Sequence, residues 1–327
     1  MPSSFGQLEK LRYVLGIVRD ANPFQQVKLR DCGLPKDFSS VEEFIEGCPF
    51  TTKDELACDR IDNPPYGTNL SYPLGRYVRF HQTSGTKGSP MSWLDMPEDW
   101  DWMLGNWDCV LDAAGVVPGA PCHFAFSFGP CLGCWTAFEA AARRGCLCLP
   151  GGGLTSEQRL QTILDNDVRF LFCTPTYAMH LAEVARESGF DIASSKVSKI
   201  IVAGETGGSS PEARRQISET WGKALPFDHY GMTEVGPVAY EMPGEQGGLR
   251  VMLESFLAEI VCPDTGKPVA EGEQGELVLT TLGRAGCPVL RYRTGDLVLP
   301  QWGMDDSGKP ILDLVGGILG RVDEMVV

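Results

Sequence analysis

The sequence predicts an α/β fold, in which a large, mostly parallel and helix-covered sheet is followed by a smaller β-barrel-like subdomain. Strand-like and helix-like segments alternate from about residue 76 to 240, which is the pattern of parallel strands joined by helical crossovers. After about residue 240, strand-like runs follow one another without helices between them. The chain has 327 residues, of which 43% are hydrophobic, enough for a large core and more than one folding unit.

The expected elements follow in order along the chain. Residues 1–75 form a mixed, largely helical region with proline-rich turns. The strands expected in the α/β region are RYVRFHQ, CHFAFSF, CLCL, VRFLFCT and KIIVA, and helices are expected after the last four. The strand-like runs of the β region are LRVMLESFLAEIVC, GELVLTT and VLRYR.

Start and stop residues set the ends of these helices. Thr155 and Gln158 form a capping-box pattern at the start of one helix. Thr174 precedes Pro175 at the start of the next, and Gly189 is expected to end it.

The composition excludes several functional classes. A net charge of -15 without a block of lysine and arginine argues against nucleic-acid binding. No apolar run approaches the ~20 residues that span a bilayer, and the N-terminus does not resemble a signal peptide. We therefore expect a cytoplasmic protein that binds neither nucleic acid nor membrane.

Twelve cysteines are scattered along the chain, and without a secretory signal we expect them to be reduced thiols. Two close pairs, Cys131 with Cys134 and Cys146 with Cys148, raise the alternatives of a metal site or a redox site. Zinc would need two further ligands, and the chain has only four histidines. The favoured interpretation is a helix packed on a strand, with cysteine acting as a small hydrophobic residue.

The segment HQTSGTKGSP, residues 81–90, gathers hydroxyls, a lysine and two glycines between Thr83 and Gly88. It is not a Walker A loop, which needs four residues between its first glycine and Gly-Lys. Glycines nevertheless let backbone N–H groups approach an anion, while hydroxyls donate and lysine adds charge. The segment predicts a phosphate-binding loop, with a plain surface turn as the alternative.

Three further segments carry groups suited to a nucleotide. DHYGMTEVGP, residues 228–237, follows a strand of the expected sheet, and ligands bind outside the carboxyl ends of strands in such sheets. YRTGDL, residues 292–297, places Asp296 in a turn where its carboxylate can accept two hydrogen bonds from a ribose diol. GRVDEM, residues 320–325, closes the chain.

Together these four segments resemble the adenylate-forming superfamily of acyl-CoA synthetases, adenylation domains and luciferases. Their order and lengths, with FTTKDEL near the start, are most similar to the phenylacetate-CoA ligase branch, and the resemblance extends from about Pro49 onward. It implies a large N-terminal adenylation domain and a small C-terminal domain whose lysine assists adenylation. Because the chain stops at Val327, we expect that small domain to be missing from this sequence. The expected division is an N-terminal region (1–75), an α/β nucleotide-binding subdomain (76–240), a β subdomain (241–319) and the start of the hinge (320–327).

The resemblance also implies which residues bind ATP. Asp228 would reach the amino group of adenine and Tyr230 would stack on the ring, while Asp296 and Arg321 would hold the ribose. The full implied set is Thr83, Ser84, Gly85, Thr86, Lys87, Gly88, Ala203, Gly204, Glu205, Asp228, His229, Tyr230, Gly231, Met232, Thr233, Asp296 and Arg321.

The implied catalytic residues are Lys87, Thr233 and Glu234. Thr233 would contact the α-phosphate, and Glu234 would ligate Mg²⁺. The region after DHYGMTEVGP contains no Cys or His near the place where some relatives carry zinc, so we expect no zinc there. His229 has two possible roles: it could help to position the substrate or the nucleotide, or it could be a purely structural residue.

The acyl group is expected beside an aromatic wall. FSFGP contains Phe126, Phe128 and Gly129, which match the place where relatives present an aromatic to the substrate. An apolar, aromatic pocket favours an aryl or arylacetic acid, whereas the alternative is that these are core strand residues. The other residues implied at the substrate are Ala203, Tyr230, Gly231 and Pro237.

The leading hypothesis is an AMP-forming acid–thiol ligase with ATP, Mg²⁺ and coenzyme A as cofactors. It would activate a small carboxylic acid to an acyl-adenylate and transfer the acyl group to coenzyme A. Two alternatives stay open: a module that loads the phosphopantetheine of a carrier protein, and a nucleotide-binding protein without catalysis. Whether the protein forms a homodimer is also open.

Overall fold

The computed structural model describes residues 5–30, 32–83, 90–205, 208, 210–222, 224–242 and 247–324. Within these ranges the largest element is a mixed sheet of nine strands in the order β13-β14-β9-β8-β7-β6-β5-β3-β4. Its strands are β3 (Pro121–Phe124), β4 (Leu147–Pro150), β5 (Phe170–Cys173), β6 (Lys199–Val202), β7 (Leu225–Met232), β8 (Gly236–Glu241), β9 (Gly248–Val251), β13 (Pro300–Met304) and β14 (Pro310–Val315).

The direction of strand pairing changes at β7. From β4 to β7 all neighbours are parallel, as the alternation of strands and helices predicts. From β7 to β13 all neighbours are antiparallel. The predicted α/β fold is confirmed, and its parallel sheet continues without a break into antiparallel strands from the β region.

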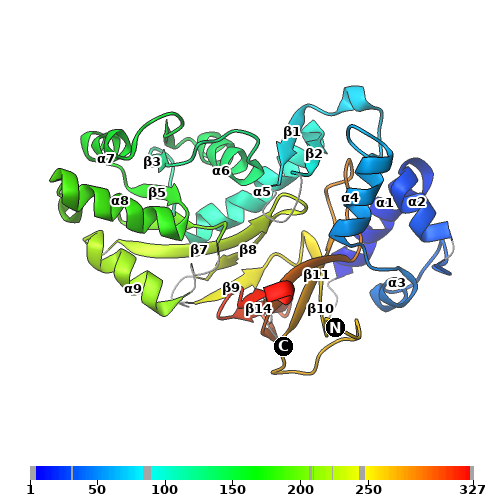
Figure 1. Cartoon of the computed structure of the whole chain (residues 1–327). Helices are drawn as coiled ribbons and strands as arrows, with labels where there is room; N and C mark the ends of the chain where they lie inside the picture. Colours follow the sequence, from blue (N-terminus) through cyan, green and yellow to red (C-terminus); the bar gives the residue numbers. More distant parts are fainter. Residues whose placement is uncertain are drawn as a thin grey trace.

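Helices cover both faces of the parallel half (Figure 1). Phe170 and Phe172 of β5 pack under two helices on one face, while Leu171 and Cys173 pack under three helices on the other. This alternation follows from the two-residue period of a strand. The first pair of helices is α5 (Pro97–Ala113) and α6 (Leu132–Arg143), and the other three are α7 (Ser156–Asp165), α8 (Pro175–Ser188) and α9 (Pro211–Thr220).

The helix ends follow the predicted signals. Thr155 and Gln158 complete a capping box at α7, and the Thr174 side chain accepts a hydrogen bond from the backbone of Tyr177 at α8. Gly189 ends α8 with a φ of 75°, a left-handed conformation that suits glycine.

A second, four-stranded antiparallel sheet has the order β10-β11-β12-β15. Its strands are β10 (Phe256–Val261), β11 (Gly275–Thr281), β12 (Tyr292–Val298) and β15 (Gly320–Arg321). The run LRVMLESFLAEIVC, expected as one strand-like stretch, supplies β9 to the large sheet and β10 to this one. A hydrogen-bonded turn redirects the chain between them, with Ser255 N donating to the Met252 carbonyl at 2.9 Å.

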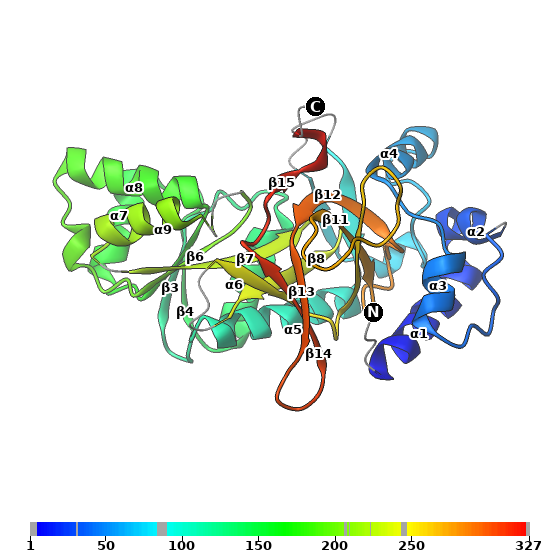
Figure 2. The same ribbon diagram turned by 90° about the horizontal axis from the view of Figure 1, so that it is seen from below.

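The N-terminal helices pack beside the four-stranded sheet. Both views place them at one end of the molecule, with α7, α8 and α9 at the other (Figure 1, Figure 2). They are α1 (Phe5–Ala21), α2 (Pro23–Arg30), α3 (Val41–Gly47) and α4 (Lys53–Asp62). A separate hairpin of β1 (Arg79–Gln82) and β2 (Ser92–Asp95) completes this part of the fold. No helix within the described ranges is both long and apolar enough to cross a bilayer.

Candidate functional site

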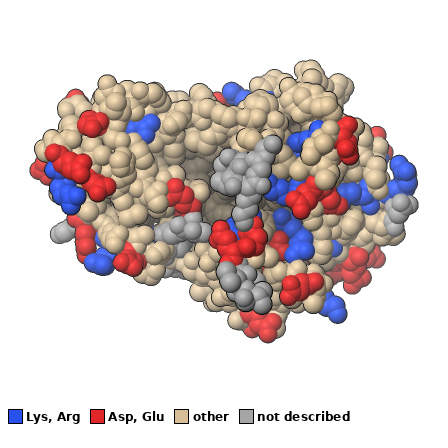
Figure 3. Space-filling view, in the orientation of Figure 1, with Lys and Arg blue, Asp and Glu red and all other residues tan. Residues whose placement is uncertain are grey.

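The predicted nucleotide residues meet where the two sheets approach each other. The β7–β8 hairpin carries DHYGMTEVGP, β12 carries YRTGDL, and β15 begins the segment GRVDEM. The space-filling view shows this face of the molecule hollowed at its middle (Figure 3).

Tyr230, Asp296 and Arg321 form one hydrogen-bonded group. The Tyr230 hydroxyl donates to Asp296 Oδ2 at 2.6 Å, and Arg321 Nη1 donates to Asp296 Oδ1 at 2.8 Å. Asp296 and Arg321 are register partners on β12 and β15. Gly295 allows the close approach, because its φ is +75° and an added Cβ would lie 2.8 Å from Arg321 Nη2. The structure therefore brings together three predicted residues from distant parts of the sequence.

The Asp296 carboxyl is 5% exposed, and its burial raises its pKa above the usual value despite the opposing contacts from Tyr230 and Arg321. Burial, followed by the charge of Asp296, raises the pKa of Tyr230 well above 10, so the phenol keeps its proton and acts as a donor. Each carboxylate oxygen can accept a second hydrogen bond. The group therefore retains capacity for a diol.

Glu234 lies in the turn between β7 and β8 and is 4% exposed. Its Oε1 accepts a hydrogen bond from the Tyr292 hydroxyl at 3.4 Å and lies 3.4 Å from Lys53 Nζ. A buried carboxylate that already attracts a cation fits Mg²⁺, which prefers oxygen ligands and often uses few carboxylates plus substrate phosphates.

Lys53 is a candidate site residue that the sequence did not suggest, since its Nζ lies 3.4 Å from Glu234 Oε1. It is the first residue of α4, and the segment before it is fixed to β12 because Thr51 N donates to the Arg291 carbonyl and Arg293 N donates to the Thr51 carbonyl, both at 2.9 Å. FTTKDEL was used only as a mark of resemblance. Its lysine, the single cation in that motif, was the signal that could have identified it.

Asp228 lies on β7 and is 7% exposed. Its backbone N–H donates to Glu241 Oε2 at 3.0 Å, and Glu241 forms a buried ion pair with Arg214 of α9 at 2.7 Å. Gly208 packs directly on the carboxylate, since an added Cβ there would lie 2.3 Å from Asp228 Oδ1. This contact explains why the chain has a glycine opposite Asp228.

His229 is oriented toward helix α5. Its ring lies edge-to-face against Trp107, with centroids 4.5 Å apart. Burial lowers the pKa of His229 to about 4, so the imidazole is neutral at pH 7. Its Nδ1 has no hydrogen-bond partner in the part of the chain that the structure describes. A neutral ring packed on tryptophan favours the structural interpretation of His229.

Ala203, Gly204 and Glu205 follow the carboxyl end of β6, as expected for ligand-binding residues of such a sheet. The Thr176 hydroxyl donates to Glu205 Oε2 at 2.7 Å, and the Thr176 backbone N–H donates to the same oxygen at 3.3 Å. These contacts fix Glu205 to the first turn of α8, next to the strand end.

Phe126, Phe128 and Gly129 lie beyond the end of β3 and not within it. The Phe128 ring contacts Trp135 and Phe138 of α6, with centroids 4.8 and 5.6 Å away. Phe126 and Phe128 are partly buried. The segment therefore forms an aromatic surface after the strand, as the acyl-pocket hypothesis requires.

Most of the glycine-rich loop lies outside the described residues. Thr83 is described, whereas Ser84, Gly85, Thr86, Lys87 and Gly88 are not. Thr83 closes the base of the loop, since its backbone N–H donates to the Met91 carbonyl and its hydroxyl accepts from Met91 N, both at 3.0 Å. The remaining predicted residues, Gly231, Met232, Thr233 and Pro237, lie on or next to the β7–β8 hairpin.

The structure corrects one expectation about the cysteines. Cys131 and Cys134 are joined by a disulfide, and all cysteines were expected to be reduced. Their spacing in the first turn of α6 brings their Cα atoms to 5.5 Å, which lies within the range of disulfides. Cys146 and Cys148 remain free.

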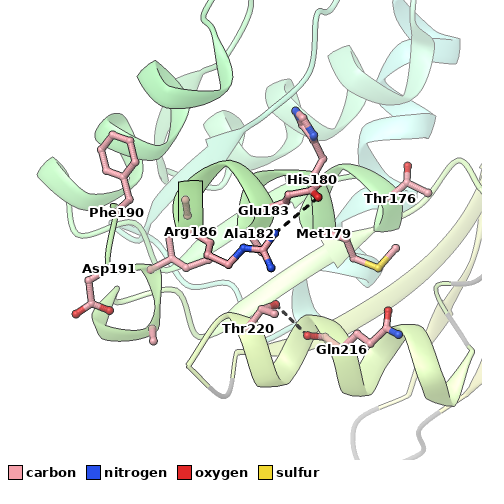
Figure 4. A pocket seen from close by; sticks show the side chains of 13 residues that line it. Thr176, Met179, His180, Ala182, Glu183, Arg186, Phe190, Asp191, Gln216 and Thr220 are labelled. Atoms are coloured by element: carbon pink, nitrogen blue, oxygen red, sulfur yellow. Dashed lines mark hydrogen bonds and ion pairs between the residues drawn. The ribbon is translucent and has the colours of Figure 1, made fainter. Parts of the chain in front are cut away.

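A second hollow lies away from these residues, between α8, the short helix η2 (Ile192–Ser194) and α9 (Figure 4). Its volume is about 640 Å³. Glu183 and Arg186 form an exposed ion pair on its wall, and Thr176 at one end contacts Glu205. None of its lining residues was predicted as a site residue.

Comparison with known proteins agrees with this geometry. The family model described as AMP-binding enzyme matches residues 106–285. The chain is 33% identical to the phenylacetate-coenzyme A ligase of Pseudomonas putida, over 98% of this chain and 71% of that protein. It is 32% identical to the phenylacetate-coenzyme A ligase of Thermus thermophilus, over the same shares of the two chains.

Solved structures show the same relationship. An open conformation of 2-hydroxyisobutyryl-CoA ligase, in complex with 2-HIB-AMP and CoA, matches with a TM-score of 0.90 and 26% identity, covering 98% of this chain and 75% of that chain. The fold, the arrangement of the described motif residues and these similarities agree. The chain therefore belongs to the AMP-binding enzyme family of adenylate-forming acyl-CoA synthetases, in its phenylacetate-CoA ligase-like branch.

Proposed function

We propose that this protein is an AMP-forming acid–thiol ligase that activates an aryl or arylacetic acid with ATP and transfers the acyl group to coenzyme A. The observation that carries the proposal is the Tyr230–Asp296–Arg321 group beside Glu234. In this proposal Asp296 would accept the ribose diol and Glu234 would ligate the metal, in a chain similar to phenylacetate-CoA ligases. The aromatic surface at Phe126 and Phe128 supports the acid class.

The proposed nucleotide contacts follow the geometry of the site. Asp296 and Arg321 hold the ribose, and Asp228 and Tyr230 hold the adenine. The glycine-rich loop from Thr83 to Gly88 holds the β- and γ-phosphates. In this arrangement the nucleotide lies along the β7–β8 hairpin, with its phosphates directed toward the β1–β2 hairpin.

The protein's part in adenylation is mainly positioning. The acid's carboxylate attacks the α-phosphorus in line and pyrophosphate leaves, so little covalent chemistry falls to the protein. Thr233 contacts the α-phosphate, and Glu234 would hold Mg²⁺, which supplies neutralisation of phosphate charge. Lys53 and Lys87 add positive charge on the side of the leaving group, where an otherwise acidic protein would repel it.

The second half-reaction is attack of a thiol on the acyl-adenylate, which releases AMP. Coenzyme A is the proposed acceptor, and a carrier-protein phosphopantetheine is the competing one. We also propose a cytoplasmic location and the division into regions 1–75, 76–240, 241–319 and 320–327.

The direct test is ATP–pyrophosphate exchange with a panel of carboxylic acids, followed by addition of coenzyme A to the intact protein. We expect exchange to be stimulated most by aryl or arylacetic acids, and coenzyme A to yield the acyl-CoA ester. Adenylate formation without any CoA ester would replace coenzyme A with a carrier protein. The absence of exchange with every acid, in a sample that binds ATP, would contradict the ligase function.

Changing Lys53 to glutamine is expected to weaken ATP·Mg²⁺ binding about 10- to 100-fold, because charge-assisted contacts to phosphate contribute about 1.5–3 kcal/mol. AMP binding should change little, since AMP lacks the β- and γ-phosphates. Calorimetric titration of each nucleotide measures both effects.

The matched control is Lys309→Gln. Lys309 also pairs with one glutamate, Glu254, at 2.9 Å and has a similarly exposed side chain, 64% against 53% for Lys53. The Lys309→Gln variant should bind both nucleotides as tightly as the wild type does. Equal ATP affinity in the Lys53 and Lys309 variants would remove Lys53 from the phosphate site.

A further inference from the structure

Arg284 is a fully buried arginine that touches two of the proposed ATP-binding segments. It lies in the connection between β11 and β12 and is 0% exposed. Its Nε donates to Asp95 Oδ1 at 2.7 Å, and its Nη1 donates to the backbone carbonyl of Thr233 at 2.8 Å. One guanidinium thus joins the β1–β2 hairpin, which leads into the glycine-rich loop, to the β7–β8 turn, which carries Glu234.

Asp95 holds the hairpin end of this connection. It is the last residue of β2 and is 0% exposed. Its Oδ2 lies 3.5 Å from Nδ1 of His81 on the paired strand, and its backbone carbonyl accepts from Val78 N at 3.0 Å. Burial acts to raise the pKa of Asp95, but the Arg284 cation and His81 outweigh it and hold the pKa below its usual value. The contact is therefore an ion pair between Arg284 and a carboxylate on β2 that also lies beside His81 of β1.

Asp99 fixes the backbone on the other side of Arg284. Its Oδ1 accepts from Ala285 N at 2.7 Å and from Gly286 N at 3.1 Å. Its Oδ2 accepts from Met96 N at 3.0 Å, at the start of α5. Since the main chain next to Arg284 is held in place, the guanidinium has little freedom to follow a movement of either segment.

Stability alone gives a weak reason for this arrangement. Buried ion pairs can often be replaced by apolar residues without loss of stability. Arg284 Nη2 and Asp95 Oδ2 have no hydrogen-bond partner among the described residues, which is unfavourable for buried polar atoms. Unlike an apolar pair, the ion pair forms a directional link of defined length between the hairpin and the turn.

We propose that Arg284 and Asp95 are positioning residues that set the distance between the glycine-rich loop's hairpin and the Thr233–Glu234 turn, so that both segments reach one triphosphate. The inference rests on the proposed function. It predicts an effect that depends on the ligand. ATP contacts both segments and needs the link, whereas AMP contacts only the turn and the Asp296 side of the site.

The test replaces both partners with apolar residues, Asp95→Leu together with Arg284→Met. Removing one partner would leave a buried charge unpaired and destabilise the fold, whereas removing both avoids that penalty. We expect the melting temperature to stay close to that of the wild type. AMP affinity should stay within about twofold, while ATP·Mg²⁺ affinity falls about 10- to 100-fold because the two segments are misplaced.

The matched control is the double change Asp313→Leu with Arg250→Met. This pair joins β9 and β14 through two contacts of 2.7 Å, in the antiparallel part of the large sheet. It should leave the ratio of ATP to AMP affinity unchanged. That ratio separates positioning from general stability, because a structural defect would weaken both nucleotides together.

Two outcomes overturn the inference alone. One is a folded Asp95→Leu/Arg284→Met variant whose ATP-to-AMP ratio equals that of the wild type. If that variant does not fold, Arg284→Lys provides the second measurement, since lysine keeps the charge but lacks the guanidinium fork that reaches both partners. An unchanged ratio in Arg284→Lys overturns the inference as well. A wild-type protein that binds AMP and ATP no better than guanosine nucleotides would instead contradict the proposed function, and the inference would fall with it.

Discussion

Changing Glu234 to glutamine is expected to lower ATP–pyrophosphate exchange by about 100-fold or more at limiting Mg²⁺, since a metal-held phosphate charge is worth several kcal/mol. Glutamine keeps the shape of the side chain and can still accept from the Tyr292 hydroxyl, but it lacks the negative charge that attracts the cation. The fold should persist, because the only ion pair lost among the described contacts is the one with the half-exposed Lys53. Exchange rates measured across a Mg²⁺ titration test this.

The control for Glu234→Gln is Glu254→Gln. Glu254 also pairs with a single exposed lysine, Lys309, but it lies outside the proposed site. The control should retain the wild-type Mg²⁺ dependence. Near wild-type exchange by Glu234→Gln at limiting Mg²⁺ would show that this carboxylate does not hold the metal.

Changing Asp296 to asparagine is expected to weaken both ATP and AMP about 10- to 100-fold, because hydrogen bonds to a charged acceptor contribute about 1.5–3 kcal/mol. The variant loses the charge that Arg321 and Tyr230 orient. The affinities for ATP and AMP should fall equally, since both nucleotides carry the ribose. This distinguishes the change from those at Lys53 and Arg284, which should affect ATP selectively.

The Asp296 prediction includes a pH dependence. Burial raises the pKa of the carboxyl, so wild-type affinity should be lost as pH falls through that raised value, at a higher pH than for an exposed aspartate. The asparagine variant should lack this step. A carboxyl whose pKa is raised by folding contributes unfavourably to stability once it is ionised, so Asp296→Asn should not lower the melting temperature near neutral pH.

Calorimetric titration at several pH values, with thermal unfolding in the same buffers, measures these effects. Asp313→Asn is the control, because Asp313 also accepts from an arginine, Arg250, on a different part of the sheet. If Asp296→Asn binds AMP as tightly as the wild type, the ribose assignment fails and the site must rest on Glu234 and the β7–β8 hairpin.

Local patterns predicted the parallel half of the fold well. Three of its helices, α7, α8 and α9, begin at short-range signals such as Thr155 with Gln158, and strands such as β5 are short apolar runs. Such signals depend on neighbouring residues, which the sequence shows directly. The path after residue 240 was less predictable, because the turn at Met252 that separates β9 from β10 looks like part of one apolar run.

The candidate site shows the same division. Asp296, Tyr230 and Glu234 lie in recognisable motifs, so the sequence could propose them as site residues. Lys53 and Arg284 were not proposed, since nothing next to either residue indicates its partner. Asp95 lies 189 positions from Arg284 in the chain, and Glu234 is similarly remote from Lys53. The disulfide between Cys131 and Cys134 was also not predicted. The expectation of reduced thiols rested on the composition and the lack of a secretory signal, and neither shows how close two cysteines lie in the first turn of a helix.

By itself the sequence determined the order of strands and helices in the parallel region, the residue types of the motifs and the family, because these depend on residue types and short spacings. Only the tertiary structure decided which of these groups meet. It pairs Tyr230 and Arg321 on the two sides of Asp296, directs His229 against Trp107, and places Lys53 beside Glu234. The physical reason is that such contacts depend on how two sheets and a hairpin pack, and packing is set by the whole core and not by any one segment.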